Sequence, residues 1–290
     1  MKSSIISSEL KNRTILITGG AGSIGSALVK ELLKHPIKTA RILDVNEHAL
    51  FRLKRSIYDS RIRLLLGSIL DKERIELAGK NVDIVIHVAA VKNIEITEFN
   101  PFETIDTNIN GTVNMIKMAI HNKIKKFVNI STDKAVEPST LYGTTKQIGE
   151  KLVSWAGLHI DNTRFATVRL GNVSDTNGNV FEIWNEEAKS EQPLSITDLN
   201  MKRYFLSSNE AVQFIVKCLP LVNKGEIFIP KMKLYNMKEL ASKISKKHRI
   251  IGIRQGEKIE EVLLSIEEKD LAKEKSDMWI IRHDIHTKLG

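Results

Sequence analysis

Short apolar runs alternate with longer amphipathic stretches through the first 170 residues of the chain. Each run is almost entirely apolar and is bounded by polar or turn-forming residues, a pattern typical of strands buried inside a parallel sheet. The pattern predicts six strands, at residues 14–18, 41–44, 63–66, 84–87, 126–130 and 166–169. Between the fourth and fifth strands, one apolar stripe with helical spacing is formed by Ile105, Ile109, Val113, Ile116 and Ile120.

Strands that alternate with helices predict an α/β fold with a doubly wound parallel sheet and right-handed crossovers. The character of the chain changes after residue 169. Residues 171–178 predict a loop, residues 210–219 a helix on the sheet, and residues 225–290 short strands, such as 226–229, with charged helices. We expect a sheet domain of residues 1–170 plus about 205–224, and a small C-terminal α/β domain of residues 171–204 and 225–290.

Composition narrows the class of protein. The chain has 290 residues and a single cysteine, Cys218, which excludes an internal disulfide and a multi-cysteine metal site. We expect no bound metal and a reducing, cytoplasmic location. No apolar run is long enough to span a bilayer, and residues 1–10 lack the apolar segment of a secretory signal, so we expect no membrane insertion.

The net charge of +9 raises the possibility of a nucleic-acid partner. The basic residues are spread along the chain, however, and the densest run, residues 243–249, is typical of a helix end with a solvated face. We therefore predict no nucleic-acid binding. A modest positive field also favours an anionic small-molecule substrate.

A glycine-rich stretch, TGGAGSIG at residues 18–25, follows the first predicted strand and opens a predicted helix. Three glycines at this spacing allow a tight turn, close approach of the backbone to a pyrophosphate, and tight helix packing, while the helix N-terminus attracts phosphate. The alternative is an ordinary glycine-rich turn, but strand, turn and helix follow in the required order. The stretch predicts an NAD(P)-binding Rossmann domain, with cofactor contacts from Gly19, Gly22, Ser23, Ile24 and Gly25.

Asp44 stands at the end of the second predicted strand, 19 residues after Gly25. A carboxylate there can accept hydrogen bonds from the ribose hydroxyls of NAD and would repel the 2′-phosphate of NADP. No arginine directly follows Asp44, which favours NAD. Arg41 is near in sequence, so NADP stays open.

Tyr142 and Lys146 lie four residues apart and share one face of a predicted helix, just after a strand that ends in Ser131 and Thr132. We expect the lysine charge to favour the phenolate and to lower the pKa of Tyr142 from its usual value of about 10. Such a pair can remove a hydroxyl proton while hydride leaves for the cofactor.

Several further stretches accompany these motifs. They are HVAAVK at 87–92, NPFE at 100–103, TN at 107–108, STDKA at 131–135, YGTTK at 142–146, RLGNV at 169–173, MKRYF at 201–205, GEIFIP at 225–230 and RQGEK at 254–258. Together they resemble the polysaccharide-biosynthesis branch of the extended short-chain dehydrogenases, the UDP-N-acetylglucosamine 4,6-dehydratases, including the 5-inverting type. The most specific stretch is STDKA, because sugar epimerases of this fold typically have no lysine after the aspartate.

The resemblance implies a redox-neutral dehydration of a UDP-sugar. Tyr142, helped by Lys146 and Thr132, would oxidise the C4 hydroxyl, with hydride passing to the cofactor. Lys134 would then remove the C5 proton and Asp133 would protonate the departing C6 hydroxyl, before hydride returns to C6. Proton return to the opposite face of C5 would give the 5-epimer. An exposed salt bridge or a loop cap is the alternative interpretation of Asp133 and Lys134.

The resemblance also implies binding roles for residues outside these motifs. The further cofactor contacts would be Ser68, Ile69, Ala89, Ala90, Lys92 and Asn108, together with Tyr142 and Lys146. The substrate contacts would be Lys92, Asn172, Arg203, Arg254 and Glu257. For Lys92, a solvated loop lysine is an equal alternative, and His87 is more typical of a buried strand-end histidine than of a catalyst. The chain departs from the family at Ser68, where aspartate is usual, at Asn93, in the loop 174–179, and at Gln255.

Two other functions stay open. A UDP-sugar 4-epimerase would use the same tyrosine and lysine without expelling the C6 hydroxyl, and Lys134 is the feature that argues against it. A non-catalytic dinucleotide-sensing protein commonly lacks the Tyr142–Lys146 pair. By analogy with this fold, we expect a homodimer or a higher homo-oligomer formed through the helices that carry the 105–120 stripe and Tyr142.

Overall fold

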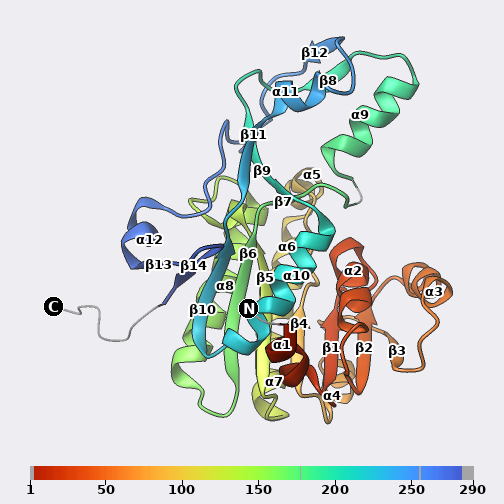
Figure 1. Cartoon of the computed structure of the whole chain (residues 1–290), viewed down its shortest axis with the longest axis vertical. Coiled ribbons are helices and arrows are strands. Elements are labelled where there is room, and N and C mark those ends of the chain that lie inside the picture. Colours follow the sequence, from red (N-terminus) through yellow and green to blue (C-terminus); the bar gives the residue numbers. More distant parts are fainter. Residues whose placement is uncertain (1–2, 177, 255, 283–290) are drawn as a thin grey trace.

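A nine-stranded sheet forms the centre of the computed structural model, which describes residues 3–176, 178–254 and 256–282 (Figure 1). All six predicted strands are present within one or two residues of their expected bounds. They are β1 (Thr14–Thr18), β2 (Thr39–Asp44), β3 (Ile62–Leu66), β4 (Ile84–His87), β5 (Lys126–Thr132) and β6 (Arg164–Leu170). The buried residues of β1, β4 and β5 explain why their sequences read as continuous apolar runs.

The spatial order of the sheet is β13-β14-β10-β6-β5-β4-β1-β2-β3. The seven strands from β3 to β10 (Lys224–Pro230) run parallel, whereas β14 (Met278–Ile281) and β13 (Ala272–Glu274) are antiparallel additions at one edge. The order reverses between β1 and β4, so the carboxyl ends of these strands border the crevice in which doubly wound sheets bind ligands. The predicted α/β doubly wound fold is confirmed.

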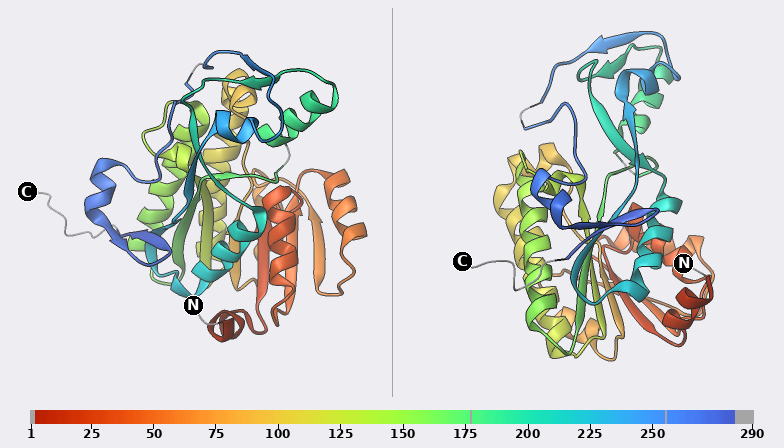
Figure 2. Two further views of the ribbon diagram at one scale, coloured as in Figure 1. Left: turned by 45° about the horizontal axis from the view of Figure 1, so that its top comes forward. Right: turned by 60° about the vertical axis from the view of Figure 1, so that its left-hand side comes forward.

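Helices cover both faces of the sheet, as Figure 2 shows. One face carries α2 (Ser23–Leu32), α3 (Glu47–Ser56) and α10 (Ser208–Cys218), with α1 (Ser3–Leu10) contributing the buried Leu10. The other face carries α4 (Lys72–Gly79), α7 (Gly111–His121) and the long α8 (Leu141–His159). A separate apolar core lies between the sheet and the helices on each face. The helices on both sides fix the positions of the carboxyl ends of the strands.

A smaller lobe stands above the carboxyl ends of the strands (Figure 1). It contains a sheet of β7 (Asn172–Val173), β9 (Lys202–Leu206) and β11 (Lys233–Asn236), and a parallel pair of β8 (Leu194–Ile196) and β12 (His248–Ile250). The helices α9 (Val180–Lys189) and α11 (Met237–Ala241) pack on these strands around the buried Trp184. The lobe therefore has a core of its own.

The C-terminal segment differs from the expected division. Residues 225–290 were expected in the smaller domain, but β10, β13 and β14 extend the large sheet, and α12 (Ile266–Leu271) lies beside them. The reason is the buried apolar sequence of β10, where Ile227, Phe228 and Ile229 need cover on both faces. Pairing beside β6 provides that cover.

The predicted apolar stripe is also interrupted. A π-helical turn (Asp106–Asn110) separates α6 (Pro101–Ile105) from α7, and α5 (Ile94–Phe99) precedes them. This turn rotates the helix, so the core receives Met115, Ile116 and Ala119, while Ile105 remains 37% exposed. The residues therefore do not form the single buried face that their spacing predicts. None of the helices in the described ranges is both long and apolar enough to cross a bilayer.

Candidate active site

At two positions of the glycine-rich turn after β1, only glycine fits without a steric clash. Gly19 has a φ of +63°, and a Cβ there would lie 2.8 Å from the backbone nitrogen of Ala89. A Cβ on Gly25 would lie 2.3 Å from the carbonyl oxygen of Gly19. The turn therefore presses α2 against β1 and against the loop after β4, as a dinucleotide-binding turn requires.

Helix α2 begins at the same turn, with Gly22 as the preceding residue. Glycine has no side chain to cap the helix, so the amides of the first turn depend on another acceptor. A cofactor pyrophosphate fits this position, because it supplies negative charge at the positive end of the helix dipole. The side chain of Ile24 packs against the core. The space beside Gly22 is largely open, because a Cβ added there would have one neighbouring atom within 4 Å, at 3.3 Å.

Asp44 lies beside the turn at the carboxyl end of β2. Its Oδ2 accepts a hydrogen bond from the Ala21 amide and its Oδ1 accepts one from the Asn46 amide, both at 3.0 Å. These bonds fix the carboxylate where the sequence predicts the ribose hydroxyls. Arg41 donates instead to the carbonyls of Ala78 and Lys80, at 2.8 and 2.7 Å, and so caps the C-terminus of α4.

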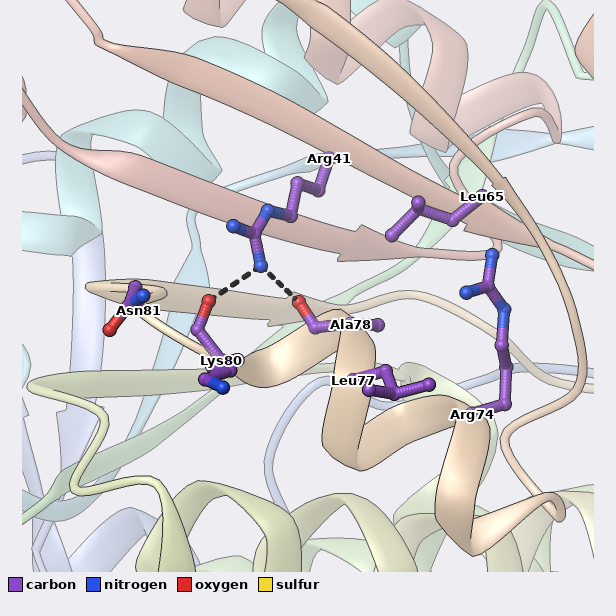
Figure 3. A pocket seen from close by; sticks show the side chains of 7 residues that line it. All are labelled: Arg41, Leu65, Arg74, Leu77, Ala78, Lys80 and Asn81. Atoms are coloured by element: carbon purple, nitrogen blue, oxygen red, sulfur yellow. Dashed lines mark hydrogen bonds between the residues drawn. The ribbon is translucent and has the colours of Figure 1, made fainter.

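Figure 3 shows the hollow into which Arg41 projects. Its volume is about 210 Å³. It is lined by Arg41, Leu65, Arg74, Leu77, Ala78, Lys80 and Asn81. It contains none of the predicted catalytic or binding residues, so it is separate from the candidate site.

The remaining predicted cofactor contacts surround the same edge of the sheet. Asn108 is buried, and its amide bonds to the Val91 amide and carbonyl and to Thr145 Oγ1, at 2.8 to 3.0 Å. It therefore ties the 89–92 loop, which includes Ala89 and Ala90, to α8. The side chain of Ile69 belongs to the core against Gly111, whereas Ser68 Oγ accepts from the Leu70 amide at the surface.

Tyr142 and Lys146 occupy the first turns of α8, which Thr140 caps by accepting from the Gly143 amide. Burial raises the pKa of Tyr142, Asp133 raises it further, and a hydrogen bond with Thr132 opposes both. The expected lowering of this pKa by Lys146 was therefore wrong: burial and Asp133 raise the pKa, and the hydrogen bond with Thr132 is what lowers it. Burial lowers the pKa of Lys146 to about 8, while Glu150 one turn further along raises it.

Asp133 and Lys134 form a short 3-10 turn (Asp133–Ala135) directly after β5. Asp133 is fully buried, and its Oδ1 accepts from Thr132 Oγ1 at 3.0 Å and from Lys134 Nζ at 3.1 Å. Lys134 Nζ also donates to Asn172 Oδ1 at 3.2 Å. An exposed salt bridge is therefore excluded. Helix α8 can pack directly against the Asp133–Ala135 turn because residue 143 is glycine. A Cβ there would lie 2.3 Å from the Lys134 carbonyl oxygen.

The predicted substrate residues are only partly brought together. Asn172 reaches Lys134, and its Nδ2 donates to the Tyr204 carbonyl at 3.1 Å. Arg203 is buried and donates to the carbonyls of Lys202, Lys258 and Ile259 at 2.8 to 3.0 Å. Its guanidinium thus holds the 257–259 segment in place. The side chain of Arg254 is exposed.

Two other predicted residues lie at the boundary between the lobes. Glu257 Oε1 is 3.6 Å from Arg203, and Glu257 Oε2 accepts from the Arg254 amide at 3.3 Å. Burial lowers the pKa of Lys92, and Glu182 on α9 raises it. Lys92 is therefore electrostatically coupled to the smaller lobe. Asn177 and Gln255, two of the departures from the family pattern, lie outside the described residues.

His87 has the structural role expected of it. Its two ring nitrogens share hydrogen bonds with Thr18 Oγ1 at 2.7 Å and Thr112 Oγ1 at 3.1 Å. Burial, with a smaller contribution from Lys146, lowers its pKa to about 3. The ring is therefore a neutral link between β1, β4 and α7. Within the described part of the chain, no group of three or more His, Cys, Asp or Glu side chains is placed to hold a metal ion.

A family model described as polysaccharide biosynthesis protein matches residues 15–283. The chain belongs to this family. The resemblance to the polysaccharide-biosynthesis branch of the extended short-chain dehydrogenases is thereby confirmed.

Curated relatives of this polysaccharide-biosynthesis protein carry different names. An uncharacterized membrane protein of Methanocaldococcus jannaschii is 41% identical over 95% of this chain and 87% of its own length. An inverting UDP-N-acetylglucosamine 4,6-dehydratase of Campylobacter jejuni is 39% identical over 94% of this chain and 84% of its own. A UDP-glucose 4-epimerase of Rickettsia bellii is 33% identical, also over 94% of this chain and 84% of its own length.

Solved structures agree with the family assignment. Pen from Bacillus thuringiensis is 36% identical, with a TM-score of 0.89 over 94% of this chain and 90% of that one. The dTDP-glucose 4,6-dehydratase DesIV from Streptomyces venezuelae, solved with NAD and TYD, is 19% identical, with a TM-score of 0.78 over 89% and 90%. At that identity the second match shows a shared fold.

Two charged groups of this family member were missed by sequence reasoning. Arg169 lies in β6, fully buried between Glu150 on α8 and Glu268 on α12. An arginine inside an otherwise apolar strand is a signal of a buried ion pair that could have been used. Glu261 lies 4.0 Å from Lys134. No spacing in the chain indicates that contact, because 127 residues (261 minus 134) separate the two positions.

Proposed function

We propose that this chain is a UDP-N-acetylglucosamine 4,6-dehydratase of the inverting type, which uses NAD. The observation that carries the proposal is the buried Asp133–Lys134 pair, bonded at 3.1 Å and placed beside the Thr132–Tyr142 hydrogen bond. Oxidation of an alcohol by a bound nicotinamide would need only the tyrosine and its lysine from the protein, whereas elimination also needs one proton taken and one given. The Campylobacter relative, 39% identical, supports this assignment.

The proposed reaction divides the work among these side chains. Tyr142 takes the proton of the C4 hydroxyl as a phenolate, a form that its hydrogen bond with Thr132 favours, and Lys146 lies one helical turn further along α8. Bound NAD would supply a temporary acceptor for the C4 hydride and its later return to C6. Lys134 removes the C5 proton, which the C4 ketone has made acidic, and Asp133 protonates the leaving C6 hydroxyl. Return of a proton to the other face of C5 inverts that centre.

Two structural features support NAD over NADP. The Asp44 carboxylate is fixed beside the glycine turn, where it would repel a 2′-phosphate. Arg41, the basic residue that left NADP open, is committed to carbonyls at the end of α4. The solved relative DesIV contains NAD. Comparing the melting temperature of the protein with NAD and with NADP tests this preference.

UDP-sugar 4-epimerisation is the second candidate, because a Rickettsia relative with that name is 33% identical. The two reactions share the C4 oxidation. They differ in the elimination step, for which the dehydratase would use Asp133 and Lys134. Proton NMR of UDP-N-acetylglucosamine incubated with the enzyme in deuterated water separates them. A new C6 methyl signal with deuterium at C5 supports dehydration, and the couplings at C5 report inversion. Conversion to the C4 epimer alone would refute the dehydratase.

Self-association is part of the proposal. Large apolar side chains are exposed on three neighbouring helices, with Phe99 at 79%, Phe102 at 78% and Trp155 at 54% exposure. Large exposed apolar side chains on helices that contact one another favour an interface between protein chains. We expect a homodimer, or a higher homo-oligomer built from it, through α5, α6 and α8. The cytoplasmic location stays a prediction.

A further inference from the structure

Lys134 has a third neighbour besides Asp133 and Asn172. Glu261 Oε1 lies 4.0 Å from Lys134 Nζ, and Glu261 is only 4% exposed. The other carboxylate oxygen, Oε2, is buried and has no hydrogen-bond partner. A buried carboxylate oxygen without a partner is costly. Such a cost persists in a protein where the group serves the adjacent chemistry.

The surrounding segment is anchored so that Glu261 must face the site. Ser139 Oγ donates to the Gly256 carbonyl at 2.5 Å, and Lys258 Nζ donates to the carbonyls of Val136 and Glu137. Residues 136–139 lie between the Asp133–Ala135 turn and α8, so residues 256–261 are tied directly to the catalytic segment. Arg203 holds the same residues from the side of β9.

The charges around Glu261 come from each of these elements. Lys134 and Asp133 face it from the turn after β5, Arg203 from β9, and Lys258 from its own segment. Burial raises the pKa of Glu261, and Asp133 adds to this, whereas the three basic groups lower it. The carboxyl group therefore exchanges its proton closer to neutral pH than an exposed glutamate does, and its charge responds to that of Lys134.

We infer that Glu261 is a positioning residue for Lys134: its carboxylate stabilises the ammonium that forms when Lys134 takes the C5 proton. This inference rests on the proposed dehydratase function. Before that step Lys134 must be a neutral amine, and afterwards it carries a charge in a site with little water. A carboxylate at 4.0 Å favours the charged product, and it also competes with Asp133 for the lysine, which leaves Asp133 able to hold the proton for C6.

The test compares Glu261→Gln with Glu260→Gln in the full-length enzyme with its bound cofactor. Glu260 is the adjacent residue, but its side chain is 41% exposed and pairs with Lys202 at 3.1 Å, which makes it a matched control. Three quantities are measured with UDP-N-acetylglucosamine: the rate of methyl formation with its KM, the absorbance of reduced cofactor, and deuterium incorporation at C5. Each is followed across the pH range.

We expect Glu261→Gln to lower kcat for dehydration by about tenfold or more, a part of the roughly 10²- to 10⁴-fold that proton-transfer groups contribute. KM and cofactor reduction should stay within about twofold, because Tyr142 and Lys146 perform that step. The low-pH limb of the kcat profile should move to lower pH, because glutamine has no carboxylate whose protonation removes the negative charge beside Lys134. Glu261→Asp should restore part of the rate.

The inference is overturned if Glu261→Gln matches Glu260→Gln in kcat and in the position of the low-pH limb. It is also overturned if cofactor reduction falls as much as dehydration, because Glu261 would then support the whole fold of the site. Should Glu261→Gln fail to fold, the same comparison applies to Glu261→Asp, whose limb must also move. Failure of the proposed function has a separate signature, because the unmodified enzyme would then form no methyl product.

Discussion

Arg169 on β6 donates to both carboxylate oxygens of Glu150 on α8, from Nε at 3.0 Å and from Nη2 at 2.7 Å. The same guanidinium donates to both oxygens of Glu268 at 2.8 and 2.7 Å and to the Leu263 carbonyl at 2.9 Å. One buried cation therefore joins α8 to α12 and to the chain that follows Glu261. Glu150 is also one turn beyond Lys146, so this network and the proposed catalytic lysine are electrostatically linked.

Replacing Arg169 should destabilise the protein. The change Arg169→Met removes the buried positive charge from between the Glu150 and Glu268 carboxylates, and we expect a loss of about 3–5 kcal/mol in the free energy of unfolding. Denaturant titration followed by circular dichroism measures it. Arg164→Met, an exposed position at the start of the same strand, is the control and should cost less than about 0.5 kcal/mol. Equal losses in both variants would contradict the buried network.

Removing the Glu150 charge should change the pH dependence of cofactor reduction. Lys146 has a pKa of about 8, which burial lowers and Glu150 raises. The ammonium is present below that pH and lost above it, so Glu150→Gln should move the high-pH limb of cofactor reduction to lower pH. The measurement is the pH profile of nicotinamide absorbance after addition of UDP-N-acetylglucosamine. The exposed Glu103→Gln should leave the limb in place, and an unmoved limb in Glu150→Gln would contradict the coupling.

Lys134→Ala should separate the two halves of the proposed reaction. Methyl formation should fall by about 10²- to 10⁴-fold, as expected for loss of a general base. Reduction of the cofactor should continue, because Tyr142 and Lys146 are unchanged. Proton NMR and nicotinamide absorbance measure the two steps on one sample. Full dehydration by this variant would remove Lys134 from the proposed mechanism.

Gly25→Ala should abolish cofactor binding. An added Cβ would lie 2.3 Å from the Gly19 carbonyl oxygen, so the turn must open and α2 must shift away from the site. Calorimetric titration with NAD should show no binding. Gly149→Ala is the matched control within α8, because its nearest neighbour would lie at 3.8 Å and alanine favours helix by about 1 kcal/mol. It should bind NAD normally and melt at the same or a higher temperature.

Phe102→Asp should weaken the proposed oligomer. A charge introduced into an apolar contact must be desolvated when two copies associate, which opposes association. Light scattering coupled to gel filtration should show a smaller mass for this variant than for the unmodified chain. Phe51→Asp, at a side chain of α3 that is 58% exposed, is the control and should leave the mass unchanged. A monomeric unmodified chain would refute the interface outright.

Local sequence was sufficient for the strands and for the glycine turn. Buried parallel strands must be apolar on both faces, so β1, β4 and β5 could be recognised from short runs, and the steric limits at Gly19 and Gly25 leave a signature in the sequence. The failures have physical causes as well. A π-helical turn at residues 106–110 rotated the stripe that ended at Ile120, and burial of the phenol raised the pKa of Tyr142, which the sequence had predicted to be lowered.

The sequence by itself determined the doubly wound sheet and the glycine turn, and it predicted the group of Asp133, Lys134, Tyr142 and Lys146, because each depends on residues close together in the chain. Only the tertiary structure decided that β10 and β14 extend the large sheet, that Arg203 anchors a segment, and that Glu261 lies beside Lys134. Those contacts join residues far apart in sequence. Their energies depend on burial and on the direction of each side chain, which arise only when the whole chain has folded.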